Sequence, residues 1–231
     1  MAIELVVFDL AGTTVKDNQD VHRILQQALA AHDVSVTLED ANEVMGIPKP
    51  IAIGQLLRRK YNGSRPITIN WIAEIHDIFV EKMINFYRTD EGVGEKDGVA
   101  ETFRRLKEKD LKVIVDTGFD RQITNPLLER MGWAKLNLID GSVTSDEVER
   151  GRPHPDLIYR AMELTNIKDS RNVAKVGDTV SDIEEGKSAG CGLVVAVTTG
   201  AFTHNALADA GPTHLIENIR ELIGILEKRE E

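Results

Sequence analysis

Five polar residues, distributed along the chain, have the types and the order that phosphoryl chemistry requires. An acid, Asp9, comes first, and a hydroxyl follows at Thr117. A guanidinium is found at Arg152, and a carboxylate pair, Asp178 and Asp182, comes last. Oxygen ligands of this kind suit Mg²⁺, and a fixed cation beside them offsets the charge of a phosphoryl group. The five residues therefore predict a site that brings a metal ion and a phosphoryl group together.

Each of these residues also has a purely structural interpretation. Asp9 and Asp178 can cap turns, and Asp182 can be the N-cap of a helix. Thr117 can bond to the backbone, and Arg152 can belong to a surface ion pair. The five residues, however, follow segments that we predict to belong to one parallel sheet, and the carboxyl ends of parallel strands meet at one edge. Their order and shared placement favour the functional interpretation.

The elements that would position these residues alternate along the chain. Strands are predicted at residues 3–8, 112–116, 136–139, 173–176, 193–197 and 214–216. Helices are predicted between them at residues 98–109, 120–131, 156–164 and 182–189. Alternating strands and helices with short connections are typical of a parallel sheet that is covered on both faces. The sequence thus predicts an α/β fold with a doubly wound, Rossmann-like parallel sheet.

A long helical segment interrupts this alternation after the first strand. Apolar residues spaced three and four apart predict helices there at residues 18–31, 38–45, 51–61 and 71–87. We interpret residues 17–91 as a small helical cap domain inserted into a core domain that comprises residues 1–16 and 92–231. Closure of the cap about residues 16–20 and 88–98 would exclude water from the site.

The turn after the first predicted strand, Asp9-Leu10-Ala11-Gly12-Thr13-Thr14, contains a glycine and two threonines. Such a turn can present backbone N–H groups to an anion. We therefore expect Gly12 and Thr13 to bind the phosphoryl group of a substrate. Thr117 and Gly118, which follow the second strand, offer a hydroxyl and a backbone amide for the same purpose.

The composition limits the classes of partner and location. The formal net charge is -10 and the basic residues form no stripe, which argues against a nucleic-acid partner. No apolar run approaches the roughly 18 residues of a membrane span, and no signal peptide is recognisable. We therefore expect a cytoplasmic protein without a membrane partner. Because the first two cap helices have apolar faces, a homodimer through the cap is a further prediction.

The same residues resemble the motifs of the haloacid dehalogenase superfamily. Its four motifs are matched by Asp9–Thr13, Thr117, Arg152 and Gly177–Asp182. Ala11 in place of the usual second aspartate, and arginine in place of the more usual lysine, are similar to the phosphonatase-like members of the superfamily. The resemblance covers the whole predicted core and extends to the cap.

This resemblance implies a Mg²⁺-dependent hydrolase. Asp9 would be the nucleophile that forms an aspartyl-phosphate, and Arg152 would offset the charge on Asp9 and on the phosphoryl oxygens. Mg²⁺ would be bound by the Asp9 carboxylate, the Ala11 carbonyl and Asp178, and Asp182 would support the waters of the metal.

Ala11 removes the residue that protonates the leaving group in typical phosphatases of the superfamily. When the leaving group is carbon, a Schiff base between a lysine and an aldehyde two atoms from phosphorus can accept the electrons. The segment Val44–Lys49 resembles the phosphonatase cap motif that ends in this lysine, and Ala52 stands where the family's cap histidine is expected. Lys49 is therefore either a catalytic lysine with a depressed pKa or a solvated loop lysine.

Three functions remain open at this point. The first is cleavage of a small phosphonate, such as phosphonoacetaldehyde, through Asp9 and Lys49. The second is hydrolysis of a small phosphate monoester, as in a phosphoglycolate phosphatase, with a water or a substrate group replacing the missing acid. The third is a non-catalytic protein on the same fold that binds a phosphate ligand or acts as a regulator.

Overall fold

A computed structural model describes residues 2–230, and among them six strands form one parallel sheet. The strands are β1 (Leu5–Asp9), β2 (Lys112–Thr117), β3 (Gly141–Thr144), β4 (Val173–Gly177), β5 (Leu193–Val197) and β6 (His214–Ile216). Their order in the sheet is β3-β2-β1-β4-β5-β6, so the chain reverses its winding direction between β1 and β4. Open α/β sheets bind ligands at such a reversal, next to the carboxyl ends of the strands. The predicted α/β fold class is confirmed.

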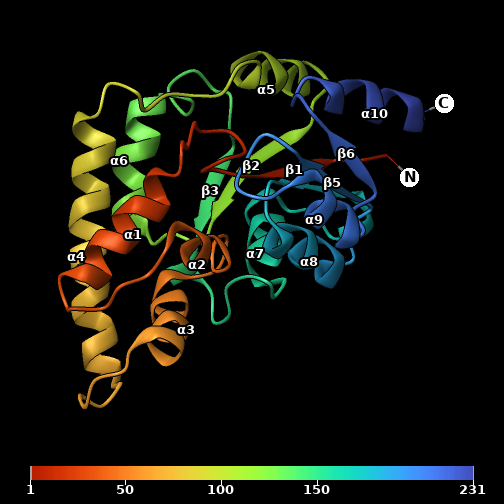
Figure 1. The fold of residues 1–231 in the computed structure, drawn as a ribbon. Helices are drawn as coiled ribbons and strands as arrows, with labels where there is room; N and C mark the ends of the chain where they lie inside the picture. Colours follow the sequence, from red (N-terminus) through yellow and green to blue (C-terminus); the bar gives the residue numbers. More distant parts are fainter. Residues whose placement is uncertain (1, 231) are drawn as a thin grey trace.

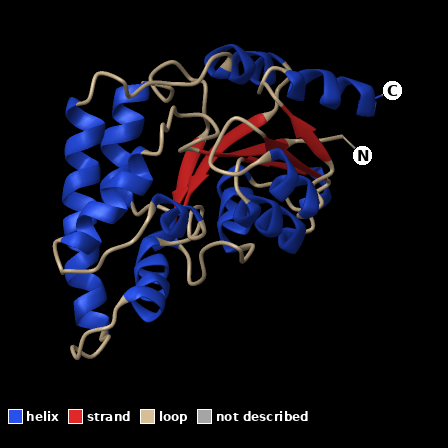
Figure 2. Ribbon diagram, in the orientation of Figure 1, coloured by secondary structure: helices blue, strands red, loops and turns tan. Residues whose placement is uncertain are grey.

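Helices cover both faces of this sheet (Figures 1 and 2). One face carries α5 (Val99–Glu108) and α10 (Glu221–Glu230), and the other carries α7 (Asp156–Thr165), α8 (Val180–Ala189) and α9 (His204–Asp209). Leu5 and Val7 of β1 belong to the core on the α7 face, whereas Val6 and Phe8 belong to the core on the α5 face. A strand buried on both faces must be apolar throughout, which explains the uninterrupted apolar run before Asp9.

The helical insert, residues 17–91, contains α1 (Asp20–Ala30), α2 (Leu38–Asn42), α3 (Lys49–Lys60) and α4 (Ile69–Thr89). Figure 1 shows α4 beside the core helix α6 (Arg121–Met131), and the two helices are in contact. The chain leaves and re-enters the sheet region through paired segments, because the Lys16 N–H donates to the Gly94 carbonyl and the Lys96 N–H donates to the Thr14 carbonyl, both at 2.9 Å. The assignment of this insert as a separate cap domain stays a prediction.

The strand predicted at residues 136–139 is wrong. Residues 133–137 form turns, Asn137 has a φ of 54°, and Leu136 is 65% exposed. The strand that pairs with β2 is β3, Gly141–Thr144. Glycine and serine at the start of β3 have low strand propensity, so the sequence signal for this strand is weak. Leu-Asn-Leu-Ile at residues 136–139 has the alternating apolar pattern of a strand but does not form one. The short helix α9 and the C-terminal helix α10 were not predicted.

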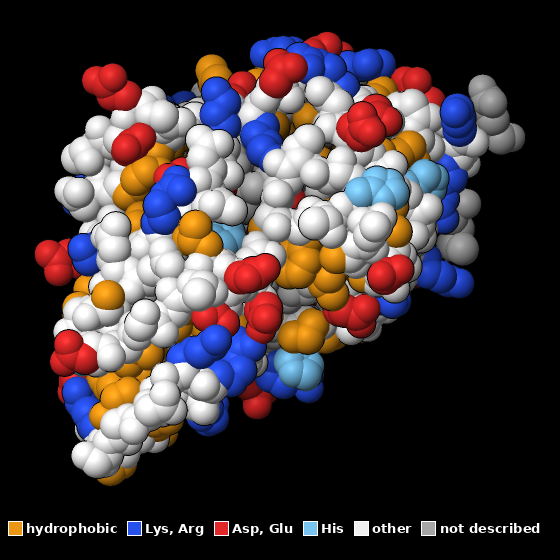
Figure 3. Space-filling view, in the orientation of Figure 1, with side chains coloured by type: hydrophobic (Ala, Val, Ile, Leu, Met, Phe, Trp, Pro, Cys, Tyr) orange, Lys and Arg blue, Asp and Glu red, His pale blue; other side chains and the backbone are white. Residues whose placement is uncertain are grey.

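Neither the net charge nor the face of the molecule in Figure 3 indicates a long-range attraction for an anion. Acidic and basic side chains are interspersed on the face shown in Figure 3, and the net charge of the chain is -10. No helix within residues 2–230 is long and apolar enough to cross a membrane. If the predicted phosphoryl site exists, cations inside it rather than the field of the surface must attract the anion.

Candidate active site

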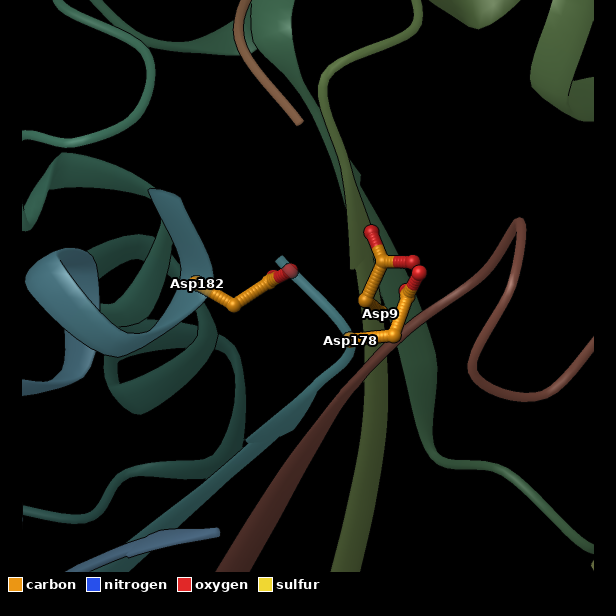
Figure 4. Close-up of side chains that lie close together, drawn as sticks. All are labelled: Asp9, Asp178 and Asp182. Carbon is orange, nitrogen blue, oxygen red and sulfur yellow. The ribbon is translucent and has the colours of Figure 1, made fainter. Parts of the chain in front are cut away.

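Three buried carboxylates converge at the winding reversal of the sheet. Asp9 is the last residue of β1, Asp178 directly follows β4, and Asp182 lies in the first turn of α8. One carboxylate oxygen from each residue lies within 4.8 Å of the others. Figure 4 shows the Asp9 and Asp178 side chains together, with Asp182 facing them from α8. The structure thus brings together the carboxylates that the sequence places 169 to 173 residues apart.

These carboxylates repel one another in a site that excludes water. Burial, followed by the charge of Asp182, raises the pKa of Asp9 well above its ordinary value. Burial and Asp182 also raise the pKa of Asp178 to about 6. The Oδ1 atom of Asp182 is buried and lies 2.9 Å from Arg152 Nη1 and 3.2 Å from Lys175 Nζ, so the repulsion is least compensated at Asp9 and Asp178. A hard divalent cation among these oxygens would relieve the repulsion, so the donor set fits Mg²⁺.

A second acidic cluster, Asp116, Asp182 and Glu185, is neutralised by protein cations instead. Lys175 Nζ lies 2.5 Å from Asp116 Oδ1 and 2.8 Å from Glu185 Oε2. Arg152 Nη1 lies 2.9 Å from Asp182 Oδ1, and its Nε lies 2.9 Å from Glu185 Oε2. Burial alone would raise the pKa of Asp182, but Arg152 and Lys175 outweigh it and hold this pKa below its ordinary value. We therefore do not interpret the second cluster as a metal site.

Arg152 orients the predicted nucleophile. Arg152 is 1% exposed, which excludes the interpretation as a surface ion pair. Nη1 donates to Asp9 Oδ1 at 2.6 Å, and Nη2 pairs with Asp116. No side chain of the described residues donates to Asp9 Oδ2. One oxygen of Asp9 is thus fixed by a cation, while the other accepts no side-chain hydrogen bond among the described residues, as the predicted nucleophile requires.

The turn after β1 supports Asp178. Thr13 Oγ1 donates to Asp178 Oδ1 at 2.8 Å, and Gly12 lies so close that a Cβ there would be 2.4 Å from Asp178 Oδ2. The Gly12 N–H donates to the Val15 carbonyl and the Thr13 N–H donates to the Leu10 carbonyl. These two amides are used inside the turn, and a direct role of Gly12 and Thr13 in phosphoryl binding stays a prediction.

Asp182 stabilises the start of α8 and also belongs to the carboxylate cluster. It is the third residue of α8 rather than its N-cap, which is Thr179. Its Oδ2 accepts from Thr179 Oγ1 at 2.6 Å and from the Thr179 N–H at 3.1 Å, forming a capping box. The other oxygen, Oδ1, points to the cations and to the carboxylate cluster. The helix start thereby fixes the direction of this carboxylate.

Thr117 ends β2 and is buried at the site. Its Oγ1 accepts a hydrogen bond from the Phe119 N–H at 3.1 Å. An oxygen that accepts from the backbone in this way can still donate its own proton to a substrate oxygen. Thr117 and Gly118 both line the central cavity, as their predicted role requires.

The central cavity has a volume of about 30 Å³ and lies between the helical insert and the sheet. Its lining includes Asp9, Ala11, Lys49, Thr117, Gly118, Phe119, Arg152 and Thr179. Lys49 is 3% exposed and is the first residue of α3, so the interpretation as a solvated loop lysine is wrong. Lys49 Nζ lies 5.4 Å from the ring centroid of Phe119 and 6.0 Å from that of Phe79. Burial lowers the pKa of Lys49 to about 8, although Asp9 opposes this change.

Backbone contacts hold the segment before Lys49 against the sheet edge. A Cβ at Gly118 would lie 2.9 Å from the Gly46 carbonyl oxygen. A Cβ at Gly151 would lie 2.4 Å from Pro48 Cγ. Glycine at these two core positions permits the insert to approach this closely. The approach carries Lys49 into the cavity that also contains Asp9.

Comparison with known proteins identifies the family. The family model described as haloacid dehalogenase-like hydrolase matches residues 3–190. The chain belongs to this family. Its predicted resemblance and its predicted hydrolase class are thus confirmed, and the interpretation as a non-catalytic protein loses its support.

Relatives of this haloacid dehalogenase-like hydrolase share most of its length. Phosphonoacetaldehyde hydrolase of Bacillus cereus is 28% identical over an alignment that covers 98% of this chain and 96% of the relative. Phosphonoacetaldehyde hydrolase of Bacillus mycoides is 30% identical, with coverages of 95% and 86%.

Two solved structures have the same fold. A phosphonoacetaldehyde hydrolase-like protein from Oleispira antarctica has a TM-score of 0.85 at 21% identity, with coverages of 99% and 92%. A predicted phosphoglycolate phosphatase from Haemophilus somnus has a TM-score of 0.81 at 20% identity, with coverages of 96% and 97%. At these identities the structural likeness establishes the fold alone.

Lys175 and Lys96 were not predicted as site residues. Lys175 lies inside the otherwise apolar strand β4. Because a lysine is almost never fully buried without a partner, its position in this strand is a sequence signal for a buried ion pair. Lys96 contacts the turn after β1 and is discussed below. Nothing in its local sequence distinguishes it from a surface lysine.

Proposed function

We propose that this hydrolase cleaves the carbon–phosphorus bond of a small phosphonate aldehyde such as phosphonoacetaldehyde. The observation that carries this proposal is the placement of the buried Lys49 in one small cavity with Asp9. Ester hydrolysis needs no amine at this position. Cleavage of a carbon–phosphorus bond does, because a Schiff base formed by the amine accepts the electrons of the carbon leaving group. The relatives named phosphonoacetaldehyde hydrolase support the same substrate class.

The lowered pKa prepares Lys49 for addition to an aldehyde. With a pKa of about 8, about one lysine in ten is neutral at pH 7, compared with about one in three thousand at the ordinary value of 10.5. The neutral amine adds to the carbonyl carbon, water leaves, and a protonated imine forms. The apolar rings of Phe79 and Phe119 maintain the low polarity that keeps the amine neutral.

Asp9 then attacks phosphorus. Its free Oδ2 forms the new bond to phosphorus, and the electron pair of the breaking carbon–phosphorus bond moves into the imine, which gives an enamine and an aspartyl-phosphate. A proton adds to the enamine carbon, and one water hydrolyses the resulting imine to acetaldehyde and free Lys49. A second water hydrolyses the aspartyl-phosphate to phosphate and Asp9. One water was released earlier, so the net reaction consumes one water.

The remaining site residues bind and orient the phosphoryl group. Thr117 and the Gly118 amide would donate hydrogen bonds to its oxygens, while Arg152 holds the attacking carboxylate. Mg²⁺ would be held by Asp9, Asp178 and the Ala11 carbonyl, with Asp182 acting on its waters, and would supply positive charge against the phosphoryl oxygens.

Movement of the insert and self-association belong to this proposal. Residues 17–91 act as a cap that opens about residues 16–20 and 88–98, because a cavity of about 30 Å³ leaves little room for a substrate in this arrangement. Small-angle scattering should therefore show compaction when Mg²⁺ and a phosphate mimic are added, and an unchanged radius of gyration would contradict closure.

A homodimer through the insert predicts a doubled mass in analytical ultracentrifugation, and a monomer at all concentrations would contradict it.

Hydrolysis of a small phosphate monoester is the second candidate. Ala11, which cannot protonate an alcohol leaving group, favours an ester whose leaving group has a low pKa, and the small cavity favours a small ester. Fold similarity to a predicted phosphoglycolate phosphatase agrees with this candidate. In this case Lys49 would contact the substrate without forming a covalent bond to it.

One assay separates the candidates. The wild type, Asp9→Asn, Lys49→Met and the exposed control Lys135→Met are incubated with Mg²⁺ and phosphonoacetaldehyde, and phosphate and acetaldehyde are measured. We expect release by the wild type and the control, and a loss of at least about a thousandfold in both other variants. Turnover of monoesters alone, dependent on Asp9 and not on Lys49, would replace the first candidate by the second. No turnover of any phosphorylated compound, with normal ligand binding by Asp9→Asn, would overturn both.

A further inference from the structure

Lys96 lies where the chain returns from the helical insert to the sheet, and it is half-buried. Its backbone N–H donates to the Thr14 carbonyl at 2.9 Å. Its Nζ donates to the Thr199 carbonyl at 2.7 Å and contacts Thr199 Oγ1 at 3.0 Å. The same Nζ also donates to the Gly12 carbonyl. One ammonium group therefore joins two loops whose positions in the sequence are 187 residues apart.

These two loops form the walls of a slot around Asp178. A Cβ at Gly12 would lie 2.4 Å from Asp178 Oδ2, and a Cβ at Gly200 would lie 1.9 Å from the same atom. Both walls also donate to the carboxylate, through Thr13 Oγ1 to Oδ1 at 2.8 Å and through the Ala201 N–H to Oδ2 at 2.7 Å. The direction of the Asp178 carboxylate thus depends on the distance between the two loops.

We infer that Lys96 is a positioning residue that ties the two walls of this slot together and thereby orients Asp178 for metal binding. The ammonium uses its donors on carbonyl and hydroxyl oxygens of the walls, and it makes no ion pair with a carboxylate within residues 2–230. The inference rests on the metal site of the proposed function, and it does not depend on which substrate is cleaved.

The electrostatic effect of Lys96 has the same direction. Burial and Asp182 raise the pKa of Asp178, and Lys96 is one of the groups that lower it again. Burial is the main influence on Lys96 itself and lowers its pKa, against the opposing charges of Asp178, Asp17 and Asp9. A neutral residue at position 96 would loosen the slot and leave Asp178 with less compensation.

The test measures Mg²⁺ binding without substrate. Calorimetric titration with Mg²⁺ compares the wild type with Lys96→Met, Lys96→Arg and Lys16→Met. Lys16 is exposed and lies on the outgoing segment beside Gly94, so its variant removes the same charge near the same loops without touching the slot. Loss of a residue that orients a metal ligand lowers metal affinity by about 10–100-fold, so we expect the Kd of Lys96→Met to rise by at least about tenfold. Lys96→Arg should restore part of this loss, and Lys16→Met should bind as the wild type does.

Each outcome decides the inference. If Lys96→Met unfolds more easily but binds Mg²⁺ with the wild-type Kd, its role is merely structural and the inference is overturned. If Lys96→Met does not fold, Lys96→Gln, which keeps one donor group without the charge, is measured against the same expectation. A third outcome is that the wild type binds Mg²⁺ and Lys96→Met binds it weakly, but the wild type cleaves no phosphonate. In that case the inference stands and the substrate proposal fails. A wild type that binds no Mg²⁺ would overturn both the inference and the metal site.

Discussion

Replacement of Lys49 by methionine should stabilise the protein while it abolishes phosphonate cleavage. Lys49 is 3% exposed and has no carboxylate partner among residues 2–230, so its charged form is destabilised in the folded state. Folding lowers its pKa from 10.5 to about 8, and each pH unit between these values corresponds to about 1.4 kcal/mol. At pH 7, below both values, the folded state therefore carries a penalty of about 3 kcal/mol, which methionine of similar shape does not.

The lowered pKa also predicts how the stability difference between Lys49→Met and the wild type changes with pH. Between about pH 8 and 10.5 the unfolded state binds more protons than the folded state, so the stability of the wild type rises with pH. The advantage of Lys49→Met should therefore be largest below pH 8 and fall to about 1 kcal/mol at pH 9.5. For a chain of this size, about 3 kcal/mol corresponds to an increase in Tm of about 6–12 °C.

Thermal and urea unfolding at pH 7 and pH 9.5, in the presence of a chelator, measure this difference. Lys135→Met is the matched control, because Lys135 is exposed and its replacement changes the same charge and shape. We expect the control to differ from the wild type by less than about 0.5 kcal/mol. If Lys49→Met were no more stable than the wild type at pH 7, the lysine would not be held in an unfavourable environment and the argument for its lowered pKa would be refuted.

Three other predictions concern the charge network, the reaction and the backbone contact. Arg152→Met should lower the free energy of unfolding by about 3–5 kcal/mol in urea denaturation, because it leaves buried carboxylates unpaired. The control Arg150→Met, at an exposed ion pair, should change the free energy of unfolding by less than about 1 kcal/mol. Equal effects of the two replacements would contradict the buried network. The kcat/KM for phosphonate cleavage should rise about tenfold per pH unit up to about pH 8, as Lys49 loses its proton, and then level off. A kcat/KM that does not change between pH 6 and 8 would argue against a Schiff base. Gly118→Ala, whose methyl group would meet the insert backbone at 2.9 Å, should lose about 1–3 kcal/mol of stability, while Gly224→Ala, with open space around it, should lose none.

Much of the candidate site was predictable because it follows strand ends. Asp9, Thr117 and Asp178 each end or follow an apolar run, and parallel strands bring such positions to one edge. Alternation of elements was sufficient to predict the sheet, since strands buried on both faces have continuous apolar sequences. The convergence of the carboxylates at one edge therefore required no knowledge of side-chain contacts, whereas the order of the strands in the sheet was not predicted.

The remaining features depend on contacts between distant segments. Lys96 resembles a surface lysine until the loops at residues 12 and 199 are placed around it, and β3 begins with residues that have weak strand propensity. The burial of Lys49 follows from the close approach of Gly118 and Gly151 to the insert, and a local sequence pattern does not specify this approach. Such contacts are set by tertiary packing rather than by periodicity.

Borohydride trapping tests the central claim most directly. The protein is mixed with phosphonoacetaldehyde and Mg²⁺, reduced with sodium borohydride, digested and examined by mass spectrometry. A stable alkyl adduct on the peptide that contains Lys49, and its absence in Lys49→Met, is the predicted result, since reduction converts a Schiff base to a secondary amine. An unmodified Lys49 in a protein that releases acetaldehyde and phosphate would contradict the claim that this lysine carries the covalent chemistry.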